Sequence, residues 1–199
     1  DCRVFVGAGS QAEFGHFREP AGEQTPTKPF SLYGAAKLSA GQMSRVHAGN
    51  IGLEHIWVRI FSVYGPGDDS RTLVSYLITE LSAGRSPELT AGEQVWDYLY
   101  SDDAAEALIL IGEKGKDGRI YSLGSGEKRL LKDYILEIRD VVNPAAEPGL
   151  GKRHYGKDHV LFLSADITDL VRDTGFSPKH AFKEGIRKII KEGETRIGN

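Results

Sequence analysis

Two runs of bulky, largely β-branched residues flank one long helical segment, and this order constrains the fold more than any other feature. RVFVGA at residues 3–8 and HIWVRIF at residues 55–61 have the character of buried strands. Between them, Ser31 can cap a helix that runs to about Ala48, where Gly-Asn-Ile-Gly supplies stop signals. Parallel strands need a crossover of this kind. The order strand, helix, strand therefore predicts part of a parallel α/β sheet.

Beyond residue 66 the pattern changes to short amphipathic helices around one strand-like segment. In these helices apolar residues recur at helical spacing, and Gly or Pro commonly follows the last of them. We expect a strand and turn at 119–126 and a long loop at 144–160. We expect helices at 73–84, 103–114 and 129–142, and two more in ITDLVRDTG and AFKEGIRKIIKEG.

Charge and composition exclude several classes of protein. The formal net charge of −3 shows no basic excess, so nucleic acid is not an expected partner. No apolar run approaches the roughly 20 residues needed to span a membrane. The single cysteine, Cys2, excludes an internal disulfide and fits a reducing compartment, so we expect a cytoplasmic protein. The six histidines show no paired metal-ligand spacing, and we expect no metal site.

The stretch SLYGAAK, residues 31–37, places Tyr33 and Lys37 four positions apart among small residues. On a helix these two side chains project from the same face. A phenol is a poor base near neutrality, but a nearby ammonium group stabilises the phenolate. Such a pair could exchange a proton with a sugar hydroxyl or carbonyl. Taken alone the spacing is weak evidence, because similar pairs occur by chance on the solvated faces of many helices.

Four motifs that occur in order give this pair a context: VFVGAGSQAEFG, TKPFSLYGAAK, WVRIFSVYGPG and VWDYLYSDDAAEAL. Together they resemble SSxxVYG, YxxxK, RxxNVYGPG and RDFxYVxD of the extended short-chain dehydrogenase/reductase family, the NAD-dependent epimerases and dehydratases of nucleotide sugars. The resemblance covers nearly the whole chain. It implies the C-terminal part of a Rossmann-type doubly wound parallel sheet plus a small mixed α/β substrate-binding domain. We expect domains at 1–65 and 66–199, with the segment 95–113 packing back on the first.

The resemblance also implies roles for individual residues. Tyr33 would be the catalytic acid/base, and Lys37 would hold the nicotinamide ribose and support Tyr33. Ser10, aligned on AEFG, would hydrogen-bond the reacting sugar oxygen. Ile60 and Val63, in the third motif, would contribute to the binding of NAD or NADP.

At four positions the chain departs from the motifs of the family. Gln11 and Ala12 stand where the 4,6-dehydratases of the family carry Asp-Glu, which disfavours dehydration. Ser62 replaces an Asn, and Trp96 replaces an Arg that pairs with the nucleotide diphosphate. Trp96 cannot make that ionic contact, although it could stack on a base or sugar. We expect Ser62 and Trp96 to contribute to substrate binding.

The sequence thus predicts an NAD(P)-dependent nucleotide-sugar epimerase or 4-keto-sugar reductase, with hydride transfer at sugar C4. The alternative is a non-catalytic dinucleotide-binding sensor of the same fold. The resemblance also implies a homodimer, with the helix at 31–48 in its interface. No G-x-x-G-x-x-G segment precedes Ser10, so we expect the N-terminal half of the Rossmann domain to be absent and the fragment to be inactive by itself.

Overall fold

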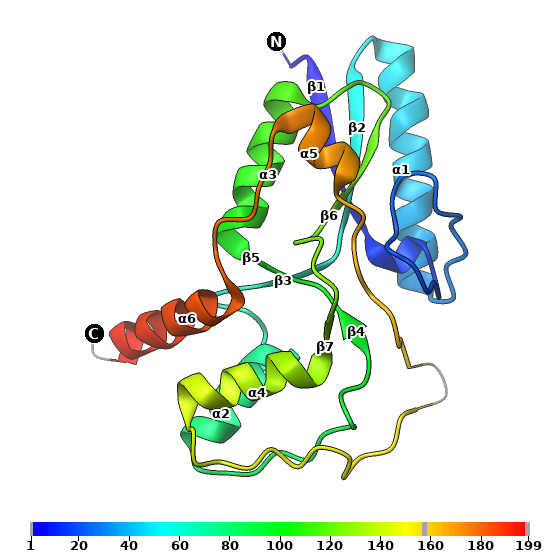
Figure 1. Cartoon of the computed structure of the whole chain (residues 1–199). Helices are drawn as coiled ribbons and strands as arrows, with labels where there is room; N and C mark the ends of the chain where they lie inside the picture. Colours follow the sequence, from blue (N-terminus) through cyan, green and yellow to red (C-terminus); the bar gives the residue numbers. More distant parts are fainter. Residues whose placement is uncertain (1, 157–158, 198–199) are drawn as a thin grey trace.

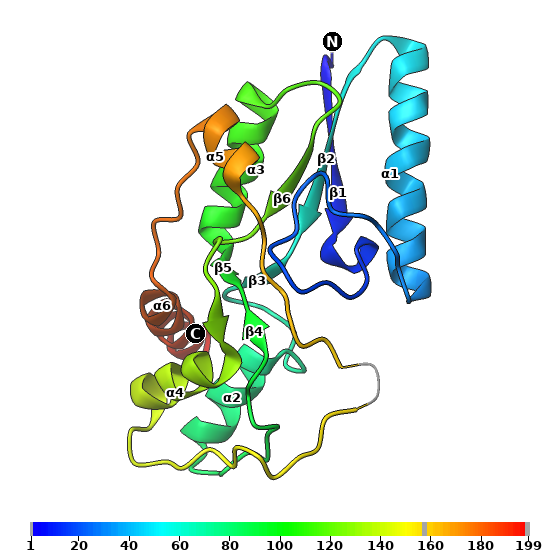
Figure 2. The same ribbon diagram turned by 45° about the vertical axis from the view of Figure 1, so that its right-hand side comes forward.

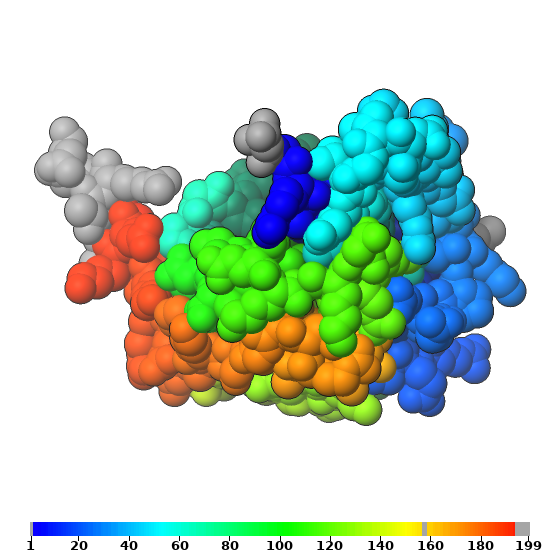
Figure 3. Space-filling view, turned by 90° about the horizontal axis from the view of Figure 1, so that it is seen from above, coloured from blue at the N-terminus to red at the C-terminus, as the bar shows by residue number. Residues whose placement is uncertain are grey.

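A three-stranded parallel sheet forms the upper part of the computed structural model, which describes residues 2–156 and 159–197. Helices cover both faces of this sheet (Figure 1): α1 lies on one face, and α3 and α5 lie on the other. In the space-filling view, the N-terminal strand (blue) lies between α1 (cyan) and α3 (green), with α5 (orange) beside α3 (Figure 3). In sheet order the strands are β1 (Val4–Ser10), β2 (Glu54–Ile60) and β6 (Ile120–Leu123), and the helices are α1 (Leu32–Ile51), α3 (Ser101–Lys114) and α5 (Thr168–Thr174). The prediction of a parallel α/β fold is confirmed.

Small residues let α1 lie close to the sheet. Gly34, Gly41 and Ala48, spaced seven residues apart, are the buried residues of this helix. A Cβ atom at Gly41 would lie 2.7 Å from Cε2 of Trp57 on β2. The same indole ring lies against Gly7 and Gly9 of β1, where an added Cβ would clash with it. The glycines of the GAGS segment are therefore explained by the packing of one tryptophan.

The lower part of the molecule consists of short strands and three helices (Figure 2). Two strand pairs occur here, one parallel between β3 and β5 and one antiparallel between β4 and β7. A single-turn 3₁₀ helix, η1, follows β1 directly in the chain. These elements are β3 (Ser62–Tyr64), β4 (Val95–Trp96), β5 (Tyr98–Tyr100), β7 (Arg129–Leu130), η1 (Gln11–Glu13), α2 (Leu73–Ser82), α4 (Leu131–Val142) and α6 (Phe182–Ile197).

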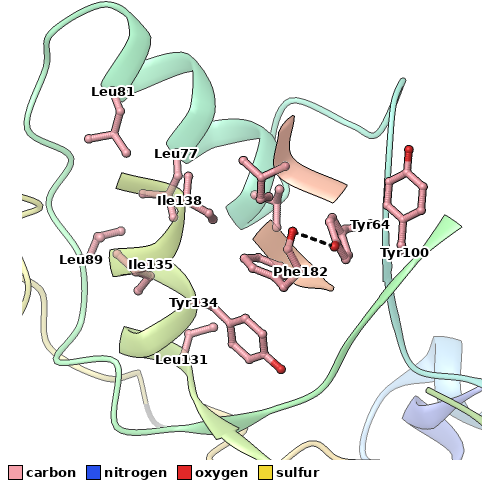
Figure 4. Packing of buried hydrophobic residues seen from close by; sticks show 12 residues of the cluster. Tyr64, Leu77, Leu81, Leu89, Tyr100, Leu131, Tyr134, Ile135, Ile138 and Phe182 are labelled. Carbon is pink, nitrogen blue, oxygen red and sulfur yellow. Dashed lines mark hydrogen bonds between the residues drawn. The ribbon is translucent and has the colours of Figure 1, made fainter. Parts of the chain in front are cut away.

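Separate hydrophobic clusters fill the two parts. One lies between the sheet, α3 and α5 and includes Val58 and Ala107. The other joins α2, α4 and α6; Figure 4 shows Leu77, Ile135 and Ile138 within it, and the Tyr64 hydroxyl donating to the carbonyl oxygen of Phe182. α3 packs on the sheet. The division into domains at residue 65, with the segment 95–113 packing back on the first domain, stays a prediction. The expected loop at 144–160 contains residues 157–158, which lie outside the described residues.

The helix expected at 103–114 is α3, which begins at Ser101. The paired residues Asp102 and Asp103 are typical of a helix start, but neither side chain caps α3. Asp103 is instead buried, and its carboxylate accepts the backbone N–H groups of Lys179 and His180. The carboxylate therefore fixes the segment that leads into α6, a partner that local sequence cannot reveal.

We expect Ile135→Ala to destabilise the protein by about 2–5 kcal/mol, because the side chain is 1% exposed and its removal leaves a cavity between α2 and α4. Ile109→Ala is the matched control, since this isoleucine is also helical but 62% exposed. It should change the free energy of unfolding by no more than about 0.5 kcal/mol. Urea unfolding followed by circular dichroism measures both. Equal effects of the two substitutions would contradict the packing described here.

Candidate active site

The three parallel strands end at one level, and this edge of the sheet forms the framework of the candidate site. In the strand register Ser10 pairs with Ile60, and Ile60 pairs with Leu123. Each of these residues is the last of its strand. In open α/β sheets ligands bind in the crevice outside the carboxyl ends of the strands. The structure therefore places Ser10 where a ligand of such a sheet would lie.

Ser10 occupies a tightly specified turn between β1 and η1. Its hydroxyl accepts a hydrogen bond from the backbone N–H of Ala12 at 3.2 Å. Its own backbone N–H donates to the carboxylate of Glu13 at 2.9 Å. The two bonds form a reciprocal capping box, a motif that satisfies donors at a helix start. These two hydrogen bonds fix the backbone of Ser10 at the edge of the sheet. The residue is 7% exposed.

Tyr33 and Lys37 lie in the first two turns of α1, beside this turn. The hydroxyl of Ser31 accepts the N–H of Gly34 and caps the start of the helix. Gly34 lies against the carbonyl oxygen of Ala12, which places this start beside the Ser10 turn. Lys37 Nζ donates to the carbonyl oxygen of Ala8 at 2.9 Å, two residues before Ser10 on β1. The same Nζ lies 5.8 Å from the centroid of the Tyr33 ring.

The Tyr33 side chain is available to a ligand. The residue is 58% exposed, and its hydroxyl makes no hydrogen bond within the described part of the chain. Its ring lies beside the ammonium group of Lys37, which donates to the carbonyl oxygen of Ala8 near the end of β1. The i, i+4 spacing predicts that the two side chains share one face of the helix. A phenol and an ammonium at an open edge can together move a proton to or from a ligand oxygen.

Glu13 is a residue to which sequence analysis gave no role. It is fully buried, and its carboxylate accepts from Trp57 Nε1 at 3.0 Å and from Arg59 Nε at 2.9 Å, in addition to Ser10 N–H. The Glu13–Arg59 ion pair is buried on both sides, with side-chain exposures of 0% and 5%. A signal for it exists in the sequence, because the buried strand HIWVRIF carries an arginine, and a buried charge requires a partner.

The two expected substrate residues, Ser62 and Trp96, contact each other. Trp96 Nε1 donates to the hydroxyl of Ser62 at 2.9 Å. Both line a hollow of about 270 Å³ that adjoins a second hollow of about 290 Å³ through shared residues. We call the two hollows together the Trp96 cleft; their shared lining residues are Leu73, Trp96 and Tyr98.

The Trp96 cleft combines aromatic and aliphatic side chains with polar groups in both of its hollows, including the carboxylates of Asp68 and Glu88. Burial raises the pKa of Tyr98, so its hydroxyl stays neutral. Gln94, Arg153 and His159 line the other hollow, and Gln94 Nε2 lies 2.8 Å from His159 Nε2. A cleft of this kind suits a ring-shaped ligand with a few polar substituents.

An aromatic cluster links the Ser10 turn to the Trp96 cleft. Phe14 ends η1 and lies 6.1 Å, centroid to centroid, from Phe61, which follows β2. Trp96 packs against the same cluster. Ile60 and Val63, the expected cofactor contacts, pack against the core beneath the sheet, and their contact with a cofactor stays a prediction.

The described residues contain neither a candidate metal cluster nor a candidate membrane-spanning helix. No group of three or more His, Cys, Asp or Glu residues among them could hold a metal ion. Over the same residues, every helix is too short or too polar to cross a membrane.

Comparison with known proteins finds one matching family, and the solved structures that resemble this chain share its fold. The model of the NAD-dependent epimerase/dehydratase family matches residues 1–124. The dTDP-glucose 4,6-dehydratase of Shigella flexneri is 28% identical over 176 residues, which cover 85% of this chain and 49% of that enzyme. The chain therefore spans about half the length of the curated relatives it matches.

Among solved structures, the chain resembles UDP-glucose 4-epimerase of Thermotoga maritima with UDP-glucose. The TM-score is 0.89 at 24% identity, covering 98% of this chain and 64% of that one. It also resembles dTDP-glucose 4,6-dehydratase of Bacillus anthracis in complex with NAD. Here the TM-score is 0.80 at 20% identity, covering 96% and 62%. These similarities show that the fold is shared.

We expect Glu13→Ala to destabilise the protein by about 3–5 kcal/mol, because it leaves the guanidinium of Arg59 buried without a counter-charge. The control is Glu80→Ala, which also removes an arginine partner, Arg85, but in an exposed ion pair. Its effect on the midpoint of urea unfolding should be small. A small effect of Glu13→Ala as well would show that the buried pair does not hold the Ser10 turn.

Proposed function

Since the chain belongs to the NAD-dependent epimerase/dehydratase family, we propose that the complete protein is a nucleotide-sugar epimerase or 4-keto-sugar reductase that uses NAD or NADP. The observation that carries this proposal is the position of Tyr33 and Lys37 at the carboxyl edge of the sheet, beside the Ser10 turn. A protein that only sensed the dinucleotide would have no need of an exposed phenol and a hydroxyl at this edge.

Tyr33 and Lys37 fit a nicotinamide cofactor because both side chains stand at an open strand edge. The bound cofactor would supply the hydride acceptor, and then the hydride donor, at sugar C4. In this proposal Tyr33 takes the proton of the sugar hydroxyl and returns it. Lys37 binds the ribose and stabilises negative charge on the Tyr33 oxygen. Ser10 orients the reacting sugar oxygen through its hydroxyl.

A nucleotide sugar is the substrate class that we assign to the Trp96 cleft. The aromatic lining at Trp96 and Tyr98 offers surfaces on which a sugar or a base can pack. The hydrogen bond to Ser62 holds the indole in one orientation. The structures of relatives that were solved with UDP-glucose or NAD support this assignment by analogy.

The residues after Ser10 argue for epimerisation or reduction rather than dehydration, although several relatives are named dehydratases. Gln11 and Ala12 form η1, and neither side chain can act as an acid. Glu13 is the acidic residue nearest in sequence, but its carboxylate is buried in the ion pair with Arg59. It is therefore committed to structure.

We further propose a homodimer that buries the outer face of α1. Besides Tyr33, four large apolar side chains on this helix are more than half exposed, and a two-fold axis would bring two copies of this face into contact. They are Leu32 at 92%, Met43 at 72%, Val46 at 67% and Ile51 at 57%.

Tyr33→Phe in the complete protein should lower turnover by at least about a hundredfold, because a positioned acid/base typically contributes about 10²–10⁴-fold. Cofactor affinity should hardly change, since Lys37 still reaches the ribose. Lys37→Met should weaken cofactor binding and move the pH optimum upward, because the phenolate loses its neighbouring cation. The measurement is a pH–rate profile with cofactor titration.

The control for this experiment is Tyr76→Phe, on α2 outside the Trp96 cleft, which should leave turnover unchanged. Near-normal turnover in Tyr33→Phe would reject the catalytic assignment and favour the dinucleotide-binding sensor.

Val46→Glu should shift the complete protein from dimer to monomer, because the two-fold axis would bring two carboxylates into an apolar interface. Val171→Glu is the matched control, since this valine is also exposed and helical but lies on α5. Sedimentation velocity at micromolar concentration measures both. A wild-type protein that sediments only as a monomer would contradict the proposed dimer.

A further inference from the structure

We propose that a cavity between α1 and β2 binds a compact oxyanion, a carboxylate or a phosphate group. The cavity has a volume of about 230 Å³ and reaches the start of β6. Residues used in the argument line it from three sides: Glu13, Gln42, Arg45, His55, Trp57 and Arg59. It shares no lining residue with the Trp96 cleft.

Arg59 supplies a buried donor that lacks a partner. The residue is 4% exposed, and its Nε is used by Glu13. Its Nη1 is buried and has no hydrogen-bond partner among the described residues. Buried polar groups in folded proteins almost always find a partner, and a guanidinium is a donor with the geometry to bind carboxylate or phosphate. Arg59 lines the cavity, so a ligand oxygen that approached its guanidinium from there would supply the missing partner.

Arg45 adds a second guanidinium at the same cavity. It lies on α1, is exposed, and has no ion pair or side-chain hydrogen bond within the described residues. The positive charge of Arg59 is already balanced by Glu13. Burial, with a further contribution from Arg45, lowers the pKa of His55, so its ring stays neutral near pH 7. Among the described residues that line the cavity, Arg45 therefore carries the one charge without an ion-pair partner, which favours an anion.

The size and position of the cavity limit the ligand. At about 230 Å³ it holds several waters, since one water takes about 30 Å³ in the liquid, but no nucleotide-sized molecule. The Trp57 ring is occupied on its sides by His55 and the glycines of β1, so it offers no free face for stacking. A small anion with two or more oxygens matches the two guanidinium groups.

An anion bound here would be linked to the Ser10 turn. It would bind the guanidinium of Arg59, whose Nε donates to Glu13, and Glu13 is the acceptor of the Ser10 backbone N–H. The Glu13 carboxylate connects the cavity to the turn, so a bound anion would alter the hydrogen bond between this carboxylate and the Ser10 N–H.

The two tryptophans of this chain give a direct test. Trp57 lines the cavity, whereas Trp96 lines the cleft. In nitrogen–proton correlation spectra of the complete protein, we expect sodium phosphate or sodium acetate, added at constant ionic strength against chloride, to shift the Trp57 indole signal saturably. The Trp96 signal should not move. The two salts distinguish a phosphate site from a carboxylate site.

Arg45→Gln removes one guanidinium without disturbing the buried ion pair and should weaken the apparent affinity by at least about tenfold. Arg18→Gln makes the same change at an exposed position outside the cavity and should leave the affinity unchanged. The proposal is overturned if neither salt shifts Trp57 saturably, if only Trp96 shifts, or if the two variants bind equally.

Discussion

The buried ion pair between Glu13 and Arg59 is the interaction on which the arrangement of the site depends. It joins η1 to β2, while the same carboxylate accepts the Ser10 N–H and the Trp57 indole N–H. Three donors converge on one buried carboxylate, so its charge is compensated where water cannot reach it. With this anchor the turn after β1 has one conformation, and Ser10 keeps a fixed place at the sheet edge.

Trp57 connects this anchor to the position of the helix. Its ring fills the space left by Gly7 and Gly9 on the sheet and by Gly41 on α1. A side chain at any of these glycines would push α1 away from β1, and Lys37 would lose its contact with the Ala8 carbonyl. The distance between the Tyr33–Lys37 pair and Ser10 is therefore set by the packing of Trp57 between the sheet and α1.

Much of the fold follows from the sequence, because its signals are local. Each strand and helix has its own periodicity and stop signals in the sequence. The i, i+4 relation of Tyr33 and Lys37 requires only that their segment be helical. The partners of Glu13 on β2 and the partners of Asp103 could not be predicted in this way. Each of them lies more than forty residues away in the chain, and only the folded structure brings it near.

The link between Ser62 and Trp96 was equally invisible, and it changes how the two departures from the family motifs should be understood. They lie on different strands, yet the indole of one donates to the hydroxyl of the other, so they form a single unit. A shorter side chain at 62 leaves room for an indole, and the hydroxyl satisfies its N–H. An indole carries no charge, however, and cannot neutralise a diphosphate. Among the described residues that line the Trp96 cleft, Arg153 is the arginine or lysine available for that purpose. In the proposed function, a diphosphate in this cleft would be contacted by Arg153, while Ser62 and Trp96 would set the shape of the site.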